Sequence, residues 1–388
     1  MRAPAVAIVR ARYNPHGGAE RYTRQAMDAL AGAGVALTVI ARRWPASAVG
    51  DGAPVRLLRV DPFHLGSVWR DQAFARGVRA VLARERFDLV QSHERIAGVP
   101  VYRAGDGVHA SYLAARSRVL PAWRAALMRA DPHHRWVLRE ERALFTSPAL
   151  RAVICNSRAV LEDIAARFGV PRERLHLLRN GVDLERFRSP TGEERARARA
   201  ALGLPEAVPV FAFVGSGFER KGLAVALAAL ARLGGDARLL VAGTDRRMAR
   251  YRAQAAALGL GGRAVFLGGV DDVRGLLWAS DAMLAPALYD PYPNAALEAL
   301  ACGLPLVASQ ACGVAELLEP GVNGFVHDAL DVAGFAASLA QIAQAREGPR
   351  GAALRQAARA AAQAWPIQAA AEALLGLWQR LLAESRGS

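Results

Sequence analysis

The chain has 388 residues, of which 53% are hydrophobic and 22% charged, and its formal net charge is +15 at pH 7. This balance is typical of a globular protein of roughly two domains, and it excludes an intrinsically disordered chain. No apolar run is long enough to span a membrane. Arginines interrupt the first apolar run, M-R-A-P-A-V-A-I-V-R, so we expect a first strand there and not a signal peptide.

The positive charge favours an anionic partner, whether nucleic acid, a membrane surface or a phosphorylated substrate. Lys221 is the only lysine, so 49 of the 50 basic residues are arginine. A single lysine in such a chain points to a position that requires a compact ammonium group, although chance survival on a surface would leave the same pattern. Cys155, Cys302 and Cys312 are odd in number and widely spaced. They favour reduced thiols in the cytoplasm and give a metal site little support.

The first half of the chain alternates strand-like and helix-like segments. Strands are expected at 4–12, 35–41, 55–60, 87–92, 152–157 and 174–183, and helices at 19–33, 67–85 and 158–168. This alternation predicts a parallel α/β sheet, in which ligands gather at the carboxyl ends of the strands. Gly17 and Gly18 separate the first strand from the first helix. They would let the backbone approach a ligand at the helix N-terminus, although such loops use glycine freely.

A glycine-rich turn, R-A-G-D-G-V-H, follows a short strand and carries Asp106 and His109. We interpret both as candidates for acid–base or polar contacts with a substrate. The alternative is a turn-stabilising aspartate and a packed histidine. Residues 111–144 then form a long, largely helical, arginine-rich stretch that includes Trp123 and Trp136. This composition is typical of a surface for anionic lipid, and also of a simple solvated helix face.

The second half repeats the α/β pattern. Residues 188–206 are polar and arginine-rich, so we place a domain boundary after residue 187. Strands are expected at 208–215, 237–243, 264–268, 282–286 and 304–309, and helices at 222–234, 246–258, 271–279 and 331–364. A final amphipathic helix, at about 366–388, is expected to return to the first domain.

The loop V-G-S-G-F-E-R-K-G (214–222) follows a strand and precedes a helix. Backbone N–H groups near Gly215, together with Arg220 and Lys221, would converge there on a diphosphate. The P-loop and dinucleotide motifs do not match this spacing. The alternative is an ordinary turn with exposed charges.

The stretch A-L-Y-D-P-Y-P-N-A-A-L-E-A-L-A places Asp290 and Glu298 eight positions apart. We expect Asn294 to cap a short helix that carries Glu298 inward, with Ala295 in its first turn. A loop carboxylate and a helix carboxylate would then face one small volume that suits a ligand with hydroxyls and an anionic group. A surface loop that enters an ordinary helix is the alternative.

Other polar residues are less informative. No D-x-D triplet occurs, so a site that binds a diphosphate without metal is favoured. His133 and His134 are adjacent and lack partners at ligand spacing, which predicts surface residues. Glu316, in the loop G-V-A-E-L, would either meet a ligand hydroxyl or cap the following helix.

Together, the Gly-Gly loop, N-G-V-D (180–183), R-K-G (220–222) and the acid-x7-Glu pair resemble the retaining glycosyltransferases of family 4, which have the GT-B fold. The adjacent Arg220 and Lys221 and the placement of Asp106 are more similar to the lipopolysaccharide core glucosyltransferases. Where the family usually has Glu-x7-Glu, the first member here is Asp290, which is one methylene shorter. This change lies on the side of the donor sugar and leaves its identity open.

The resemblance implies two Rossmann-like domains: an acceptor domain (1–187, with the final helix packed on it) and a nucleotide-sugar domain (188–365). A hexose, glucose by likeness, would pass from a UDP-sugar to a lipopolysaccharide-core or similar lipid-linked saccharide, with retention and with no metal or other cofactor. The implied donor contacts are Gly17, Gly18, Gly215, Arg220, Lys221, Asp290, Asn294, Ala295 and Glu298. Arg220 and Lys221 would stabilise the leaving diphosphate, Asp290 would hold the sugar and Glu298 the ribose. Asp106 and His109 would orient or deprotonate the acceptor.

The expected location is the cytoplasm, peripheral to the inner face of the inner membrane, where the basic charge meets an anionic acceptor. Two other function classes fit part of the pattern. A nucleotide-sugar epimerase or hydrolase of the same fold would not need the basic segment 111–144. A nucleic-acid-binding protein is suggested by charge alone, and we find no recognition module for specific nucleic acid.

Overall fold

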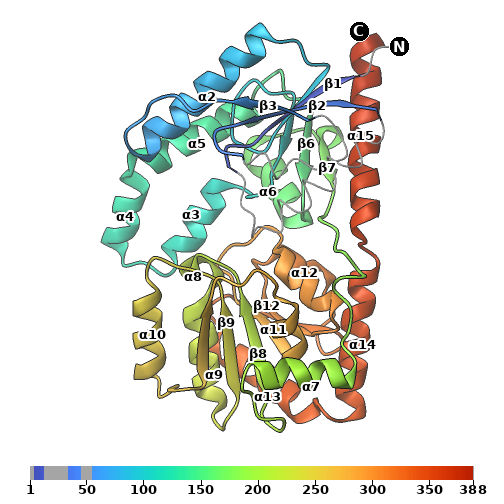
Figure 1. The fold of residues 1–388 in the computed structure, drawn as a ribbon. Coiled ribbons are helices and arrows are strands. Elements are labelled where there is room, and N and C mark those ends of the chain that lie inside the picture. The colour runs from blue at the N-terminus through green and yellow to red at the C-terminus, as the bar shows by residue number, and fades with distance from the viewer. Residues whose placement is uncertain (1–3, 13–33, 45–54, 388) are drawn as a thin grey trace. The chain divides into compact units, whose positions relative to one another are not determined.

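The computed structural model describes residues 4–12, 34–44 and 55–387 (Figure 1). Gly17, Gly18 and the helix expected at 19–33 lie outside these residues. The chain divides into two units, one of residues 1–180 with 367–388 and the other of residues 181–366. The division falls at 180/181 and not at 187/188, because Val182 and Phe187 are buried in the hydrophobic core of the second unit.

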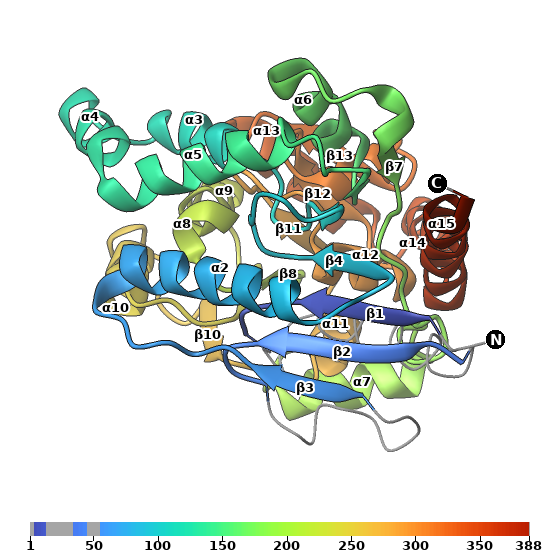
Figure 2. The same cartoon turned by 90° about the horizontal axis from the view of Figure 1, so that it is seen from above.

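The first unit contains a parallel sheet in which the described strands follow the order β3-β2-β1-β4-β5-β6-β7. These strands are β1 Ala5–Val9, β2 Ala36–Ala41, β3 Arg56–Arg59, β4 Leu89–Ser92, β5 Val101–Arg103, β6 Ala152–Cys155 and β7 Leu175–Leu177. Figure 2 shows β1, β2 and β3 side by side, with α2 (Gly66–Arg84) along one face. The expected strand at 174–183 is shorter, because the chain leaves the sheet before Asn180.

Helices cover both faces of this sheet, and β1 at its centre is buried on both sides. In β1, Ala7 and Val9 pack in one hydrophobic core, while Val6 and Ile8 pack in another on the opposite face. Besides α2, the helices in the described part of this unit are α3 His109–Ser117, α4 Ala122–Ala130, α5 Pro132–Phe145, α6 Arg158–Phe168 and α15 Ile367–Gly387. Figure 1 shows α15 running alongside the sheet, and Trp378 Nε1 donates to Gln91 Oε1 at 2.8 Å.

The basic stretch at 111–144 is helical, as expected, but it is divided among α3, α4 and α5. Pro121 and Pro132 start the second and third of these helices, because proline lacks the N–H that a helix interior needs. The Asp131 side chain accepts a hydrogen bond from the His133 N–H at 2.7 Å and so caps α5.

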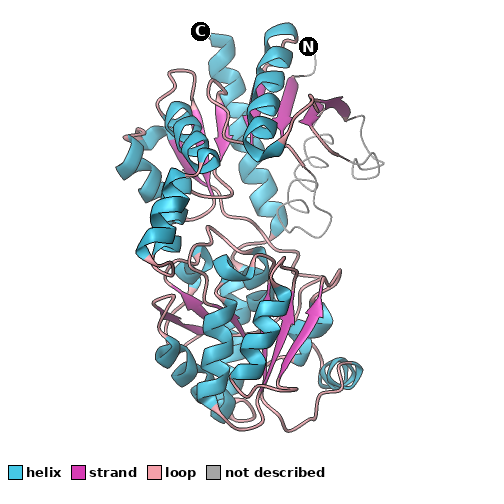
Figure 3. Ribbon diagram, turned by 90° about the vertical axis from the view of Figure 1, so that its left-hand side faces the viewer, coloured by secondary structure: helices cyan, strands magenta, loops and turns pink. Residues whose placement is uncertain are grey.

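The second unit contains a parallel sheet with the strand order β10-β9-β8-β11-β12-β13. Its strands are β8 Val210–Val214, β9 Arg238–Ala242, β10 Ala264–Gly268, β11 Ala282–Ala285, β12 Leu306–Ser309 and β13 Gly324–His327. Its helices are α7 Gly192–Ala201, α8 Phe218–Lys221, α9 Leu223–Leu233, α10 Met248–Ala257, α11 Arg274–Ala279, α12 Asn294–Ala301, α13 Val332–Ala345 and α14 Pro349–Gln363. In each unit, helices surround the strands (Figure 3).

Alternate residues of β8 again enter different cores: Val210 and Ala212 on one face, Phe211 and Phe213 on the other. Two parallel sheets, each covered by helices on both faces, confirm the predicted α/β class. The three cysteine side chains are buried and unpaired, and burial raises the pKa of each thiol to about 12. None of the described helices is long and apolar enough to cross a bilayer.

Candidate functional site

Two loops emerge from one edge of the second sheet. β8 and β11 are parallel neighbours, so their carboxyl ends lie at the same edge. The loop after β8 carries Gly215 and leads through the short helix α8 to Lys221. The loop after β11 leads to Asp290 and then to α12. The sheet order therefore brings the two predicted motifs to one place.

Glycines allow these loops to approach closely. Gly222 has φ +78°, and a Cβ atom there would lie 1.8 Å from the carbonyl oxygen of Pro286 in the other loop. The Leu288 N–H donates to the carbonyl of Arg220 at 2.8 Å, so the two loops are also joined by a backbone hydrogen bond. Only glycine combines this dihedral angle with such a close approach. The R-K-G sequence is thus explained by local geometry as well as by charge.

A buried carboxylate lies between two cations at this edge. Lys221 Nζ is 2.5 Å from Asp290 Oδ2, and Arg220 Nη1 is 3.5 Å from the same oxygen. Asp290 is 6% exposed. Burial by itself raises the pKa of this carboxyl group, but the charges of Lys221 and Arg220 outweigh burial and lower the pKa below its ordinary value. Asp290 is therefore ionised and paired with both cations.

The backbone holds Asp290 in position. Its N–H donates to the carbonyl of Ala311 at 3.0 Å, and its own carbonyl accepts from the Gly313 N–H at 2.8 Å. Gly313 begins the short helical turn Gly313–Leu317, which carries the exposed residue Glu316. The loop that contains Glu316 is therefore attached directly to the Asp290 loop.

The expectation that Asn294 caps α12 is wrong. Pro293 occupies the N-cap position, its carbonyl accepts from the N–H of Ala296 at 3.0 Å, and Asn294 is the first helical residue. The reason is that Pro293, with φ −70° and an extended ψ, ends the preceding loop and leads directly into the helix. Asn294 and Ala295 thus form the first turn. Glu298 follows on the buried side of α12, as predicted, and is 7% exposed.

Asp106 and His109 lie in the first unit, after β5. Asp106 is exposed in the turn, and His109 is the first residue of α3. His109 Nε2 lies 3.1 Å from His134 Nδ1. Burial first, and then the charge of Arg95, lower the pKa of His109 to about 3, so its imidazole is neutral near pH 7. The half-buried His134 is therefore not the simple surface residue that the sequence predicted.

Glu141 holds this segment in place, and its role was missed in the sequence. It is 1% exposed and accepts hydrogen bonds from the backbone N–H of His109 at 2.7 Å and from that of Ala110 at 3.3 Å. Arg95 Nε also donates to Glu141 at 3.0 Å. A carboxylate at a helix N-terminus, paired with an arginine, fixes the start of α3. The 32 positions between His109 and Glu141 leave no local sequence signal of this contact.

His93 and Glu94 directly follow β4, and neither was predicted from the sequence as a site residue. Arg10 Nη1 lies 3.1 Å from His93 Nδ1, and burial and Arg10 lower the pKa of His93 well below its usual range. Glu94 Oε1 accepts from the Ala11 N–H at 2.9 Å, and burial raises the pKa of Glu94. The sequence does contain a signal for both residues. In Q-S-H-E, polar residues follow a buried strand directly, which is where ligands bind in a parallel sheet. Across the described part of the chain, no group of three or more His, Cys, Asp or Glu residues could hold a metal ion.

The chain is similar to proteins of known family. A family model described as glycosyl transferases group 1 matches residues 194–364, and one described as glycosyltransferase family 4 matches residues 16–186. The D-inositol 3-phosphate glycosyltransferase of Salinispora tropica is 30% identical over 363 residues, which cover 84% of this chain and 73% of that protein.

Two solved structures are similar over nearly the whole chain. WaaG, a glycosyltransferase involved in lipopolysaccharide biosynthesis, has a TM-score of 0.82 at 24% identity, covering 95% of this chain and 98% of that one. Anabaena Alr3699/HepE, in complex with UDP and glucose, has a TM-score of 0.72 at 20% identity, with 97% and 100% covered. The chain therefore belongs to the glycosyltransferases of family 4 and has the GT-B fold.

Proposed function

We propose that this glycosyltransferase moves a hexose, glucose in the first instance, from a UDP-sugar to a lipid-linked saccharide of the lipopolysaccharide-core kind, with retention of configuration. The observation that supports this most is the cluster of Lys221 and Arg220 on Asp290 at the carboxyl edge of the second sheet. The similar fold of HepE binds UDP and glucose, and the similar fold of WaaG belongs to a protein of lipopolysaccharide biosynthesis.

On the donor side, Lys221 and Arg220 bind the diphosphate. Backbone N–H groups near Gly215, and near Gly17 and Gly18, contribute further hydrogen bonds to it. Lys221 is paired with Asp290 in this structure, so an incoming diphosphate shares a cation that a carboxylate already holds. Asp290 then binds hydroxyl groups of the sugar with its acceptor oxygens.

The helix α12 contributes the remaining donor contacts. Its first turn, Asn294 and Ala295, faces the donor with the positive end of the helix dipole. Glu298, one turn further along, binds the ribose hydroxyls through its carboxylate. We assign both roles by likeness to the family motif. The position of Asn294 and Ala295 at the helix N-terminus and the burial of Glu298 support these assignments.

In the transfer step, the bond between the anomeric carbon and the diphosphate oxygen breaks, and its electron pair leaves with the diphosphate. The acceptor hydroxyl forms the new bond on the same face of the sugar, and its proton passes to the departing diphosphate. Lys221 and Arg220 stabilise the negative charge that develops on the leaving group, which is the task that a divalent cation performs in other enzymes. We therefore propose that the reaction proceeds without metal.

On the acceptor side, we assign the polar contact with the acceptor hydroxyl to Asp106, which is exposed. His109 has a pKa of about 3, so it does not hold a proton at neutral pH and serves to orient the acceptor. Glu141 and Arg95 keep the start of α3 rigid, which fixes the position of His109.

An apolar surface on α4 supports peripheral attachment to an anionic membrane. Trp123 and Leu127 lie one helical turn apart and are 60% and 62% exposed, and Val119 precedes them and is also exposed. The guanidinium group of Arg124 lies 4.8 Å from the centre of the Trp123 ring. Apolar side chains flanked by arginines match the interface of an anionic bilayer, where rings enter the headgroup region and guanidinium groups remain at its surface.

A second acceptor class is favoured by one comparison. Relatives that are 30% identical are D-inositol 3-phosphate glycosyltransferases, so a small phosphorylated polyol is a candidate acceptor for this chain too. Such an acceptor would use the same donor site but would not need the exposed residues of α4.

The proposed function is tested by screening UDP-, GDP- and ADP-sugars by thermal shift and then assaying turnover with each acceptor. UDP-glucose should stabilise the protein, and sugar should pass to a lipid-linked core saccharide. Transfer only to an inositol phosphate would establish the second acceptor class instead. Consumption of the UDP-sugar without any acceptor would contradict both and identify a hydrolase or epimerase.

A further inference from the structure

A cavity of about 920 Å³ lies in the second unit and is lined only by residues of that unit. Its wall includes Asp281, which directly precedes β11, and Leu304, which precedes β12. These positions are at the amino edge of the sheet, whereas Lys221 and Asp290 follow the carboxyl ends of the strands. The strand β8 runs from one edge to the other, and its four steps of about 3.3 Å separate the two edges by about 13 Å. The cavity is thus a different place from the donor site.

Arginine side chains dominate the wall of this cavity. Five of them line it, from α7, from the end of α13 and from α14: Arg195, Arg199, Arg346, Arg355 and Arg359. Three carboxylates accompany them: Glu206, Asp281 and Glu347. Five positive and three negative charges leave an excess of two positive charges. An anion would reduce the repulsion among the guanidinium groups.

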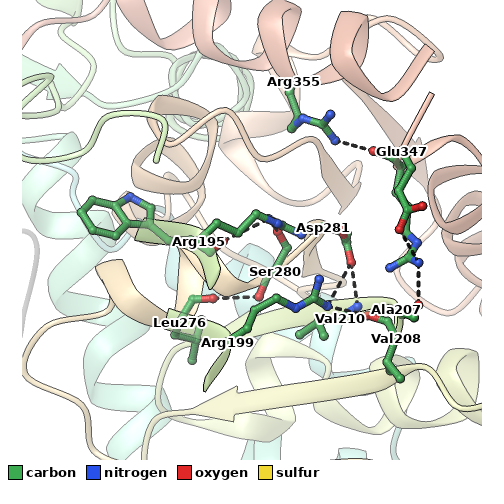
Figure 4. Close-up of polar contacts among 12 residues, drawn as sticks. Arg195, Arg199, Ala207, Val208, Val210, Leu276, Ser280, Asp281, Glu347 and Arg355 are labelled. Atoms are coloured by element: carbon green, nitrogen blue, oxygen red, sulfur yellow. Dashed lines mark hydrogen bonds and ion pairs between the residues drawn. The ribbon is translucent and has the colours of Figure 1, made fainter. Parts of the chain in front are cut away.

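The arginines are held in fixed positions. Arg195 donates to Asp281 Oδ1 at 2.6 Å and to the carbonyl of Ser280 at 2.7 Å, and Figure 4 shows Arg195 and Arg199 converging on Asp281. Arg355 donates to the carbonyl of Arg346 at 2.8 Å. Planar guanidinium groups that are already ordered lose little freedom when they bind an anion.

Burial and neighbouring positive charges both act on two arginines of the cluster. Burial first, and then the charges of Arg195 and Arg346, lower the pKa of Arg199 in spite of the opposing charge of Asp281. Burial and Arg195 lower the pKa of Arg355 in the same way. Arg199 is 6% exposed, and among the described residues its Nε finds no hydrogen-bond acceptor. The cluster therefore holds more positive charge and more donors than its own carboxylates and carbonyls satisfy.

The other residues of the wall indicate what kind of anion fits. Thr191, Gln356 and Gln363 offer hydroxyl and amide groups that both donate and accept hydrogen bonds. The volume is within the range of small-molecule sites and exceeds what a bare phosphate ion needs. We propose that this cavity binds a phosphorylated small molecule with several hydroxyl groups, of the sugar-phosphate class, at a site separate from the donor site.

The proposal is tested by isothermal titration of the full-length protein with glucose 6-phosphate, with inorganic phosphate and glucose as the other two arms. Each titration is run with and without excess UDP, and again in Lys221→Ala, so that binding at the donor site is separated from binding in the cavity. We expect one saturable site for glucose 6-phosphate that persists under all three conditions, weaker binding of phosphate and no binding of glucose.

A charge-insertion variant gives the sharpest comparison. Gln356→Glu adds a carboxylate at an exposed position of the wall without removing any arginine, and Gln344→Glu makes the same change at an exposed position of α13 outside the wall. Gln356→Glu should weaken binding about tenfold or more, whereas Gln344→Glu should not change it. Arg355→Gln should weaken binding similarly, with the melting temperature reported alongside.

Two results would overturn the proposal. One is the absence of saturable glucose 6-phosphate binding once UDP is in excess or Lys221 is replaced. The other is equal affinity in Gln356→Glu and Gln344→Glu. Neither result bears on the donor site, which is judged by UDP-sugar binding alone.

Discussion

Replacing Lys221 with alanine removes the cation that lies 2.5 Å from the buried carboxylate of Asp290. Breaking a buried ion pair by removing one partner destabilises a protein by about 3–5 kcal/mol. Arg220 remains 3.5 Å from the same carboxylate, so we expect the lower end, about 3 kcal/mol. Loss of one donor to the developing charge of the leaving group should also raise the activation free energy by about 3 kcal/mol, which lowers kcat/KM roughly 150-fold.

The pH dependence of unfolding tests the structural part of this reasoning. In the unaltered protein the pKa of Asp290 is lowered, so its stabilising contribution is present above the unfolded value of about 3.9 and is lost as the pH falls through the folded value. Without Lys221, burial should raise the folded pKa above the unfolded one. The free energy of unfolding of Lys221→Ala, measured in urea, should then increase relative to the unaltered protein as the pH falls from 7 toward 5.

A second substitution separates stability from catalysis. Lys221→Ala combined with Asp290→Asn should recover most of the lost stability, because no buried charge is left unpaired, but it should recover no activity. Arg247→Ala is the matched control, since it breaks an exposed ion pair with Glu219 in the same region and should change stability by less than about 1 kcal/mol. Near-normal kcat/KM in Lys221→Ala, or equal stability of the single and double variants at pH 7, would refute the reasoning.

Three further predictions concern other parts of the chain. Gly222→Ala should destabilise the protein in urea by about 3 kcal/mol, because a positive φ and a backbone clash add, whereas Gly217→Ala has the same φ but open space and should lose about 1 kcal/mol. His109, with a pKa of about 3, should stay neutral in an NMR titration from pH 8 to 4. In the unfolded chain His109 takes up a proton near pH 6.5, whereas in the folded protein it stays neutral there. His109 therefore lowers the free energy of unfolding as the pH drops below about 6.5, and His109→Asn should remove this contribution. Trp123→Ala with Leu127→Ala should weaken co-sedimentation with anionic vesicles by about tenfold or more.

Each of these has a contrary outcome. Equal stability of the Gly222→Ala and Gly217→Ala variants would contradict the close approach of the two loops. A His109 signal that titrates near pH 6.5 would contradict the partly buried contact between His109 and His134. Leu258→Ala removes an exposed leucine from the second unit and serves as the vesicle control, so an equal loss of binding in that variant would remove α4 as the attachment surface.

The order of strands and helices could be predicted because it depends on local patterns. Apolar strands, glycine turns and helical periodicity are read within a dozen residues, and they indicated two parallel α/β halves. Predicted helix boundaries were wrong where a proline sets the boundary. At the start of α12, for example, Pro293 and not Asn294 occupies the N-cap position. The loop with Lys221 and the stretch with Asp290 and Glu298 were also selected from local signals.

What only the tertiary structure decided are the contacts between distant residues. Lys221 meets Asp290 because β8 and β11 are neighbours in the sheet, although 69 positions separate the two residues. Glu141 caps α3 because α5 packs beside it, and the arginines of α7 and α14 gather around one cavity. The sequence by itself determined which elements form and which residues can do chemistry. Sheet order and helix packing determined which charges share a site, since that depends on long-range burial and not on local spacing.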